Sequence, residues 1–240
     1  MTDVVYVLGI GSRFYDLELK YSLRSIEKHL KDVGNVYIVG EPPWFEHNCI
    51  HIPMDDWSPC KEKNILSKIK EACSTHSISD TFLFFNDDHF LNQDHSADTF
   101  PNYYNKSLEG LLSRTNPQSS YRISVKNTID HLLSRNSTTH NFDCHTPIRY
   151  NRQSFLDINS AIPWEEERNG FTIKSLYGNL MNLDKVQFND IKINDHRPLN
   201  ELKQSVADSP VFSIGDTGLE GGQIQILLQH LYPDKCKYER

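Results

Sequence analysis

The chain has 240 residues, of which 38% are hydrophobic, 11% aromatic and 24% charged. This length and composition exclude a small disulfide-stapled scaffold and a wholly disordered chain, and they predict one good-sized globular domain. A net charge of -7 gives no general attraction to phosphate polymers, so it disfavours a nucleic-acid partner.

The first ninety residues repeat a short apolar run, a turn and an amphipathic helix, which is the pattern of βαβ units. Val4 to Leu8 predicts a buried strand. A helix is expected next, ending at Gly34, and its apolar face is formed by Leu19, Leu23, Ile26 and Leu30. This half of the chain therefore predicts an α/β fold with a parallel, Rossmann-type sheet.

Three further strands and a second helix continue this pattern. Asn35 to Val39 and Ile50 to Ile52 predict two of the strands. Ser58 and Pro59 are a good N-cap and first residue for the helix, which is expected to run to about Cys73. Thr81 to Phe85 predicts the next strand, and Asn86, Asp87, Asp88 and His89 follow at its carboxyl end.

The pattern weakens from Gln93 to Arg122, which predicts an insert with a short helix around Leu108 to Leu112. Beyond it we expect a helix from Arg168 to Asn182, a strand within Val186 to Ile193 and a last helix from Gly221 to Leu231. The loop Asn194 to Pro210 is polar and is expected to be mobile or to act as a substrate lid.

The location of the protein is predicted from its cysteines and its apolar runs. The five cysteines are odd in number, scattered and free of C-x-x-C pairs, which favours a reducing cytoplasm over a disulfide framework or a zinc site. No apolar run approaches the roughly 20 residues that cross a bilayer, so no membrane span is expected. The N-terminal residues do not have the pattern of a secretory signal.

Asp87 and Asp88 are the strongest candidates for metal ligands. Two adjacent carboxylates repel each other unless a cation or strong donors lie beside them, and ligands bind at the carboxyl ends of strands in open α/β sheets. Mg²⁺ and Mn²⁺ take carboxylate oxygens and keep positions for substrate phosphates. The alternative is that the pair caps a helix that begins at His89.

Small and basic residues are candidates for contacts to a phosphate-bearing ligand. Gly11, Ser12 and Arg13 follow the first strand, where small residues let a ligand approach the backbone and an arginine can meet a phosphate. The segment lacks the third glycine of G-x-G-x-x-G, so a generic tight turn is the alternative. Further candidates on the two helices are Arg24, Lys63, Asn64 and Lys68. Their alternatives are a snorkelling surface arginine and a solvated basic helix face.

His145 is the candidate general base or phosphate-holding residue. It lies in a short segment that Pro147 makes rigid, and both roles are common for histidine. A buried histidine satisfied by the backbone is the alternative. A nucleophilic pair with Cys144 is disfavoured, because adjacent residues in an extended segment point to opposite sides.

Three of these segments together resemble the second conserved region of the Stealth family, which transfers sugar phosphates in capsule synthesis. They are Glu18 to Lys28, Val36 to Val39 and Phe82 to Leu91, in the family's order and spacing. His145 in H-T-P resembles the histidine of a later conserved region. The family opens with V-Y-T-W-V-D-G, whereas this chain has Val5-Tyr6-Val7-Leu8-Gly9-Ile10-Gly11 and lacks the acidic residue.

The wider resemblance is to glycosyltransferases of the GT-A type, whose nucleotide-binding half ends in a D-x-D-like metal motif. Three later segments are similar to small stand-alone relatives from phages and bacteria: Ser175 to Asn179, Phe212 to Asp216 and the tail from Pro233 to Glu239. The resemblance implies a single GT-A-like domain over 1–240, with 1–92 as the nucleotide-sugar half and 93–240 as the acceptor-side half.

The resemblance also implies the reaction class. We expect a transferase that uses a nucleotide sugar, a UDP-sugar above others, with Mn²⁺ or Mg²⁺ on Asp87 and Asp88. The acceptor would be a glycan or another hydroxyl compound, and Asp216 is a second candidate for the catalytic base after His145. The alternatives are Stealth-like sugar-1-phosphate transfer, glycosylation of DNA bases, and a non-catalytic nucleotide- or glycan-binding module.

Overall fold

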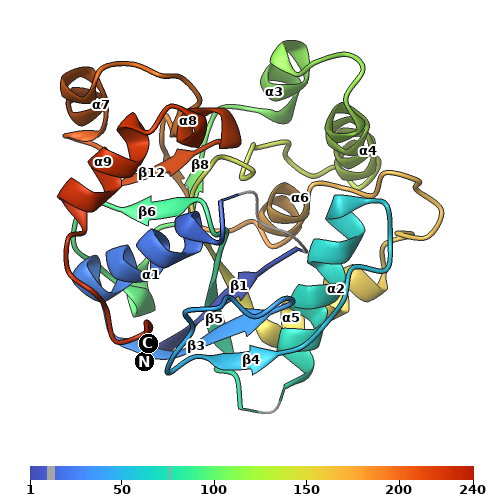
Figure 1. The fold of residues 1–240 in the computed structure, drawn as a ribbon. Helices are drawn as coiled ribbons and strands as arrows, with labels where there is room; N and C mark the ends of the chain where they lie inside the picture. Colours follow the sequence, from blue (N-terminus) through green and yellow to red (C-terminus); the bar gives the residue numbers. More distant parts are fainter. Residues whose placement is uncertain (10–13, 76) are drawn as a thin grey trace.

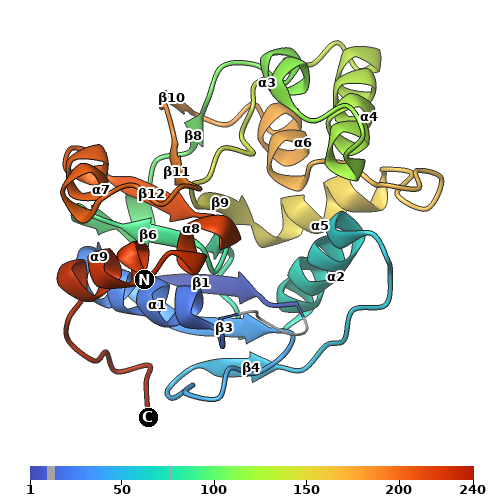
Figure 2. The same ribbon diagram turned by 45° about the horizontal axis from the view of Figure 1, so that its top comes forward.

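A computed structural model describes residues 1–9, 14–75 and 77–240. The largest sheet among these residues has five strands, in the order β4 (Ile50–Ile52), β3 (Val33–Val39), β1 (Thr2–Val7), β5 (Thr81–Phe85) and β9 (Ile148–Asn151). Figure 1 labels the first four strands of this order, and Figure 2 labels β9. The first four are parallel, and β9 pairs with β5 in the antiparallel direction. The parallel sheet predicted from the first ninety residues is therefore confirmed.

Helices cover both faces of this sheet. α1 (Leu17–His29) covers one face, while α2 (Lys61–Ser74) and α5 (Arg152–Ser160) cover the other (Figure 1). Side chains alternate along β1, so that Tyr6 packs in the core with α1 and Val5 packs in the core with α2. Because the helices occupy the faces, the carboxyl ends of the strands stay accessible to a ligand.

Both helices of the first half differ from the sequence prediction at one end. α1 ends at His29, because the chain turns there into the short strand β2 (Leu30–Lys31) before it reaches β3. α2 begins at Lys61 with Cys60 as its N-cap, so Ser58 and Pro59 precede the helix. The Asn64 amide bonds the backbone N–H and C=O of Ser58, at 2.9 and 2.7 Å, which holds that approach to the helix.

A second, three-stranded sheet meets the first at the carboxylate pair. It consists of β11 (Ile191–Ile193), β12 (Val211–Ile214) and β6 (His89–Leu91), with β12 parallel to β11 and antiparallel to β6. β6 follows β5 after the turn that contains Asp87 and Asp88. The helix-cap alternative for this pair is therefore wrong, because His89 begins a strand.

The remaining elements surround these two sheets. The short strands are β7 (His95–Ser96), β8 (Tyr103–Tyr104) and β10 (Val186–Gln187), and the helices are η1 (Ala97–Thr99), α3 (Leu108–Arg114), α4 (Ser120–Ser134), α6 (Ile173–Leu180), α7 (Leu199–Val206), α8 (Asp216–Glu220) and α9 (Gln223–Leu231). Figure 2 shows α3, α4 and α6 gathered beyond β9, on the side away from β4. Among the described residues, no helix is long and apolar enough to cross a membrane.

The C-terminal part differs most from its prediction. The loop 194–210 contains helix α7, whose Leu202 and Val206 are buried in the core around β12 and α9. The expected helix 168–182 is shortened to α6, and the expected strand 186–193 is divided into β10 and β11. The short helix expected around Leu108 to Leu112 corresponds to α3, whereas α4, with 15 residues, was not predicted.

Candidate active site

A cleft of about 1050 Å³ opens at the carboxyl ends of β1 and β5. Its wall includes Gly9 after β1, the first turns of α2, the turn 86–88, the loop that carries His145, and the ends of β11 and β12. Of the described residues, eight with carboxyl side chains and four lysines line this cleft. The excess of carboxylates favours the binding of a cation.

Asp88 is held by a lysine on one side and is unpartnered on the other. Its Oδ2 accepts a hydrogen bond from Lys192 Nζ at 3.2 Å, whereas Oδ1 is buried and has no hydrogen-bond partner among the described residues. His89 Nε2 lies 3.8 Å from Oδ1, and burial lowers the pKa of this imidazole well below its usual value. Burial opposes ionisation of Asp88, but His89, Lys192 and His145 outweigh it and lower the pKa of the carboxyl group.

Asp87 lacks this support. Burial, followed by the charges of Asp88 and Glu18, raises the pKa of Asp87 from 3.8 to about 7. A carboxyl group with this pKa gains from an added cation, because the cation replaces the missing counter-charge. The two adjacent carboxyl groups therefore differ in charge state near neutral pH, and both line the cleft.

His145 faces the same site as a neutral imidazole. Burial, followed by the nearby Lys192 amine, lowers the pKa of His145 from 6.5 to about 4, against the opposing charge of Asp88. The side chain lines the cleft. A neutral imidazole can accept a proton, so this placement is compatible with the predicted role of a base.

Two charged side chains from other elements fix the loop that carries His145. Lys174 of α6 donates hydrogen bonds to the carbonyls of Cys144 and Thr146, at 2.6 and 3.0 Å, on either side of the histidine. Asp190 accepts the backbone N–H of His145 at 3.0 Å. The peptide backbone at this histidine is therefore held at several points, which limits the positions that the imidazole can take.

Two of the predicted ligand-binding residues line the cleft with their polar atoms already engaged. Lys68 Nζ donates to the carbonyl of Leu8 and to Asp56 Oδ1, each at 2.5 Å. Asn64 is engaged by both backbone groups of Ser58. Both side chains fix the cleft wall and would have to break these bonds to contact a ligand directly.

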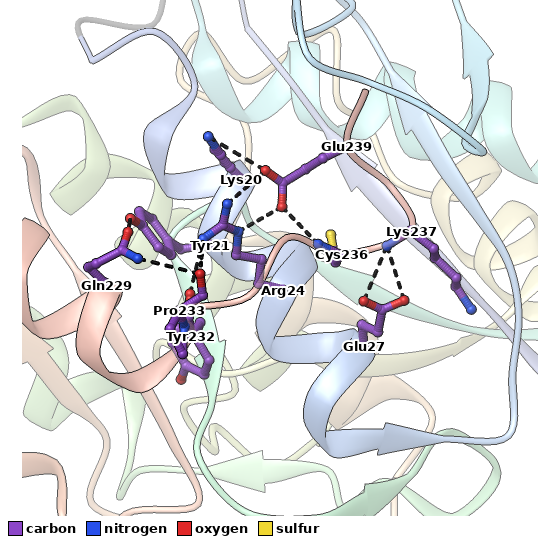
Figure 3. Close-up of polar contacts among 10 residues, drawn as sticks. All are labelled: Lys20, Tyr21, Arg24, Glu27, Gln229, Tyr232, Pro233, Cys236, Lys237 and Glu239. Atoms are coloured by element: carbon purple, nitrogen blue, oxygen red, sulfur yellow. Dashed lines mark hydrogen bonds and ion pairs between the residues drawn. The ribbon is translucent and has the colours of Figure 1, made fainter.

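Arg24 is placed away from the cleft, which corrects its prediction as a ligand-binding residue. Its Nε and Nη2 bond the two carboxylate oxygens of Glu239 at 2.6 and 2.9 Å, as Figure 3 shows. The remaining nitrogen of the guanidinium, Nη1, donates hydrogen bonds to the backbone carbonyls of Tyr232 and Pro233. The guanidinium is therefore committed to holding the C-terminal tail against α1, and the snorkelling alternative is wrong as well because the side chain is buried.

Lys63 also lies outside the cleft, on another face of α2, where its amine is 3.9 Å from Glu165 Oε2. It lines a different cavity, which corrects its prediction as a donor-binding residue of this cleft. Asp216 lines the cleft at the first position of α8. Gly11, Ser12 and Arg13 lie outside the described residues.

Cys144 does not serve as a nucleophile in this arrangement. Burial raises the pKa of its thiol to about 11. The sulfur lies 3.3 Å from both the Tyr103 carbonyl and the Thr146 hydroxyl. The thiol is therefore protonated and packed within the core.

Three cleft residues were not singled out from the sequence. Lys192 alternates with Ile191 and Ile193 in a strand, a pattern that predicts a side chain pointing away from the core. Lys174 is the single charged residue of α6. Glu62 has a pKa raised to about 7 by burial and by Asp143, and its sequence neighbours give no comparable signal.

The donors of the cleft fit a divalent cation that binds together with phosphate. No group of three or more His, Cys, Asp or Glu side chains in the described ranges is arranged to hold a metal by itself. Mg²⁺ at phosphate sites is commonly held by one or two carboxylates and completed by phosphate oxygens and water. Asp87, with its raised pKa, and Asp88, with its orphaned buried oxygen, provide such a pair.

Comparison with known proteins identifies the fold. No family model matches the chain, and no curated protein matches its sequence. A crystal structure of the galactosyltransferase LgtC in complex with donor and acceptor sugar analogues matches with a TM-score of 0.54 and 10% identity, over 97% of this chain and 95% of that one. An active-site mutant of LgtC matches with a TM-score of 0.51 and 10% identity, over 96% and 95%. The chain therefore has the mixed α/β GT-A fold that its sequence predicts.

Proposed function

We propose that this protein is a metal-dependent glycosyltransferase that moves a sugar from a nucleotide sugar, a UDP-sugar above others, to a hydroxyl acceptor. The observation that carries the proposal is the buried oxygen Oδ1 of Asp88, which lies in the main cleft close to the end of β5 and has no hydrogen-bond partner among the residues that the structure describes. The likeness in fold to a galactosyltransferase solved with donor and acceptor sugar analogues supports the reaction class. The resemblance of the sequence to GT-A enzymes supports it independently.

In this proposal Asp87 and Asp88 hold Mn²⁺ or Mg²⁺ against the diphosphate of the donor. The bound ion would neutralise negative charge that develops on the leaving nucleoside diphosphate. Lys192 lies at Asp88 and supplies a cationic contact from the second sheet. Arg13, in the loop after β1, stays a predicted phosphate contact.

His145 is the proposed base or acceptor-orienting residue. Its neutral imidazole can take the proton of the acceptor hydroxyl as that oxygen attacks the anomeric carbon. Lys174 and Asp190 hold the backbone of its loop, so the imidazole needs little reorganisation to do this. Asp216 stays the second candidate for this role.

Sugar-1-phosphate transfer is the second candidate function, because three segments of the chain resemble the Stealth family. The two reactions break different bonds. Attack at the anomeric carbon expels the nucleoside diphosphate, whereas attack at the sugar-linked phosphorus expels the nucleoside monophosphate. We favour the first reaction, because the chain lacks the acidic residue of the Stealth opening block.

Product analysis tests the proposal. The protein is incubated with UDP-glucose, UDP-galactose and UDP-N-acetylglucosamine in the presence of Mn²⁺, with a sugar acceptor or with water as a slow surrogate, and the nucleotides are separated by chromatography. We expect UDP from at least one donor, released at least about 10²-fold more slowly by the Asp88→Asn variant. UMP would favour sugar-phosphate transfer, and release of neither nucleotide would favour a non-catalytic binding module.

A further inference from the structure

A second cavity, of about 300 Å³, lies against a different face of α2 from the main cleft. Residues three and four apart share a helix face, so the side chains of α2 sort into two sets. Those that line the second cavity are Lys63, Leu66, Ser67 and Lys70. Asn64 and Lys68 line the cleft instead, so α2 forms a wall common to both spaces.

Trp57 is an exposed aromatic residue that is fixed at this cavity. Its side chain is 57% exposed, and its indole N–H donates to Ser67 Oγ at 2.9 Å. This bond holds the ring in place before any ligand arrives, so little conformational entropy is lost on binding. The residues on either side of it in the chain, Asp56 and Ser58, line the main cleft. The segment 56–58 therefore contributes side chains to both spaces.

The cavity combines an apolar floor with a polar rim. Leu66, Ile162 and Trp164 are buried and form the floor, and Trp164 is fixed by a hydrogen bond from its indole N–H to Asn159 Oδ1 at 3.2 Å. The charged side chains of the rim are Lys63, Lys70, Glu165 and Glu166. Two positive and two negative charges cancel, and together they offer both hydrogen-bond donors and acceptors.

We propose that this cavity is a saccharide-binding subsite for a neutral sugar unit of an oligosaccharide acceptor, whose reacting end lies in the main cleft. A hexopyranose has a face of C–H bonds that fits against an indole ring and a rim of hydroxyl groups that both donate and accept. The volume is at the lower end of the range for ligand pockets, which begins at about 300 Å³. The inference about the acceptor rests on the proposed function, whereas the binding of sugar does not.

Binding in the absence of turnover tests the subsite. The full chain is titrated by isothermal titration calorimetry with lactose, maltotetraose and cellotetraose in EDTA, without nucleotide. We expect at least one of them to bind with millimolar or tighter affinity, and Trp57→Ala to weaken that binding at least tenfold. Trp44→Ala is the matched control, because Trp44 is also exposed, at 68%, but does not line either cavity.

A second variant isolates the fixed ring. Ser67→Ala removes the partner of the indole N–H without removing the ring, and we expect it to weaken binding severalfold. Absence of binding by every probe, or equal binding by wild type and Trp57→Ala, would overturn the subsite. UDP release from the donor, measured separately, would still stand in that case, so the two proposals fail independently.

The link to the acceptor has its own readout. With an oligosaccharide acceptor, Trp57→Ala should raise the acceptor KM about tenfold and leave kcat and the donor KM unchanged. With a single-sugar acceptor the same variant should match wild type. An equal loss with long and short acceptors would contradict a role of the cavity in holding the distal part of the acceptor.

Discussion

Two groups of buried charges in this protein differ in how completely they are partnered. The Arg24–Glu239 pair is closed: two direct bonds join the side chains, and Glu239 also accepts the backbone N–H of Cys236 (Figure 3). The Asp87–Asp88 pair is open, since among the described groups only Lys192 bonds the Asp88 side chain. A buried charge without partners is costly, so it is retained where a ligand completes it.

Asp88→Asn gives the largest expected effect on the open pair. Loss of this carboxylate should lower the rate of UDP release about 10²- to 10³-fold, as for other electrostatic contacts to a reacting group. The fold should survive, because Oδ1 has no partner in the described chain to lose. Initial rates and circular dichroism check both points, and near-normal activity would refute the role of Asp88.

Arg24→Met tests the closed pair and should act on stability alone. It leaves the carboxylate of Glu239 buried without its main partner, which should lower the free energy of unfolding by about 3 kcal/mol in urea titrations. Arg24→Lys keeps the positive charge but cannot make both hydrogen bonds to the Glu239 carboxylate. Its free energy of unfolding should therefore lie between those of wild type and Arg24→Met. An Arg24→Met variant with unchanged stability but strongly reduced turnover would instead support a direct role of Arg24 in ligand binding.

His145→Ala should lower turnover about 10²-fold, the lower part of the range for general bases. The expected loss is smaller than for Asp88, because the metal-bound donor would still be in place. Binding of UDP with Mn²⁺, measured by calorimetry, should stay within a factor of three of wild type. Loss of the folded state, seen by circular dichroism, would instead support a purely structural histidine.

Lowering the pH should change the stability of the folded protein in opposite directions through the two pairs. We expect this effect to be the smallest of those predicted here. Asp87 has a pKa of about 7 in the folded chain against an ordinary 3.8, so the folded state binds the extra proton and stability rises as pH falls from 7 toward 4. For Glu239, burial opposes ionisation but the hydrogen bond from Arg24 lowers the pKa from 4.5 to about 2, so its contribution is lost as pH falls from 4.5 toward 2.

Thermal unfolding between pH 2 and 8 checks these signs in the absence of metal. Asp87→Asn should remove the gain between pH 7 and 4, and Glu239→Gln should remove part of the loss below pH 4.5. If the gain in thermal stability between pH 7 and 4 persists in Asp87→Asn, another group takes up the proton. Glu62 would be the first candidate, because its pKa is also raised to about 7.

The strands and the open pair were predictable because their signals are local. Apolar runs such as Thr81 to Phe85 specify buried strands, and two carboxylates close to the end of such a run mark a strand-end site. Asp88, His145 and Asp216, which the sequence offered as separate candidates, all line one cleft.

The partners of charged residues were not predictable, because they lie far apart in the chain. Arg24 and Glu239 are separated by 215 positions, and Lys192 and Asp88 by 104. Periodicity shows that Arg24 belongs to a helix but says nothing of what it meets there. Helix α7 was missed for a related reason, since its two buried residues, Leu202 and Val206, are too few for a clear apolar face.

The most direct test of the open pair is the binding of UDP with and without a divalent cation. We expect Mn²⁺ and UDP together to raise the free energy of unfolding by about 2.7 kcal/mol when free UDP is at 100 times its Kd. UDP in EDTA should give no shift, and Asp88→Asn should abolish the shift in Mn²⁺. Equal stabilisation by UDP in Mn²⁺ and in EDTA, unchanged in Asp88→Asn, would contradict the account of this cleft.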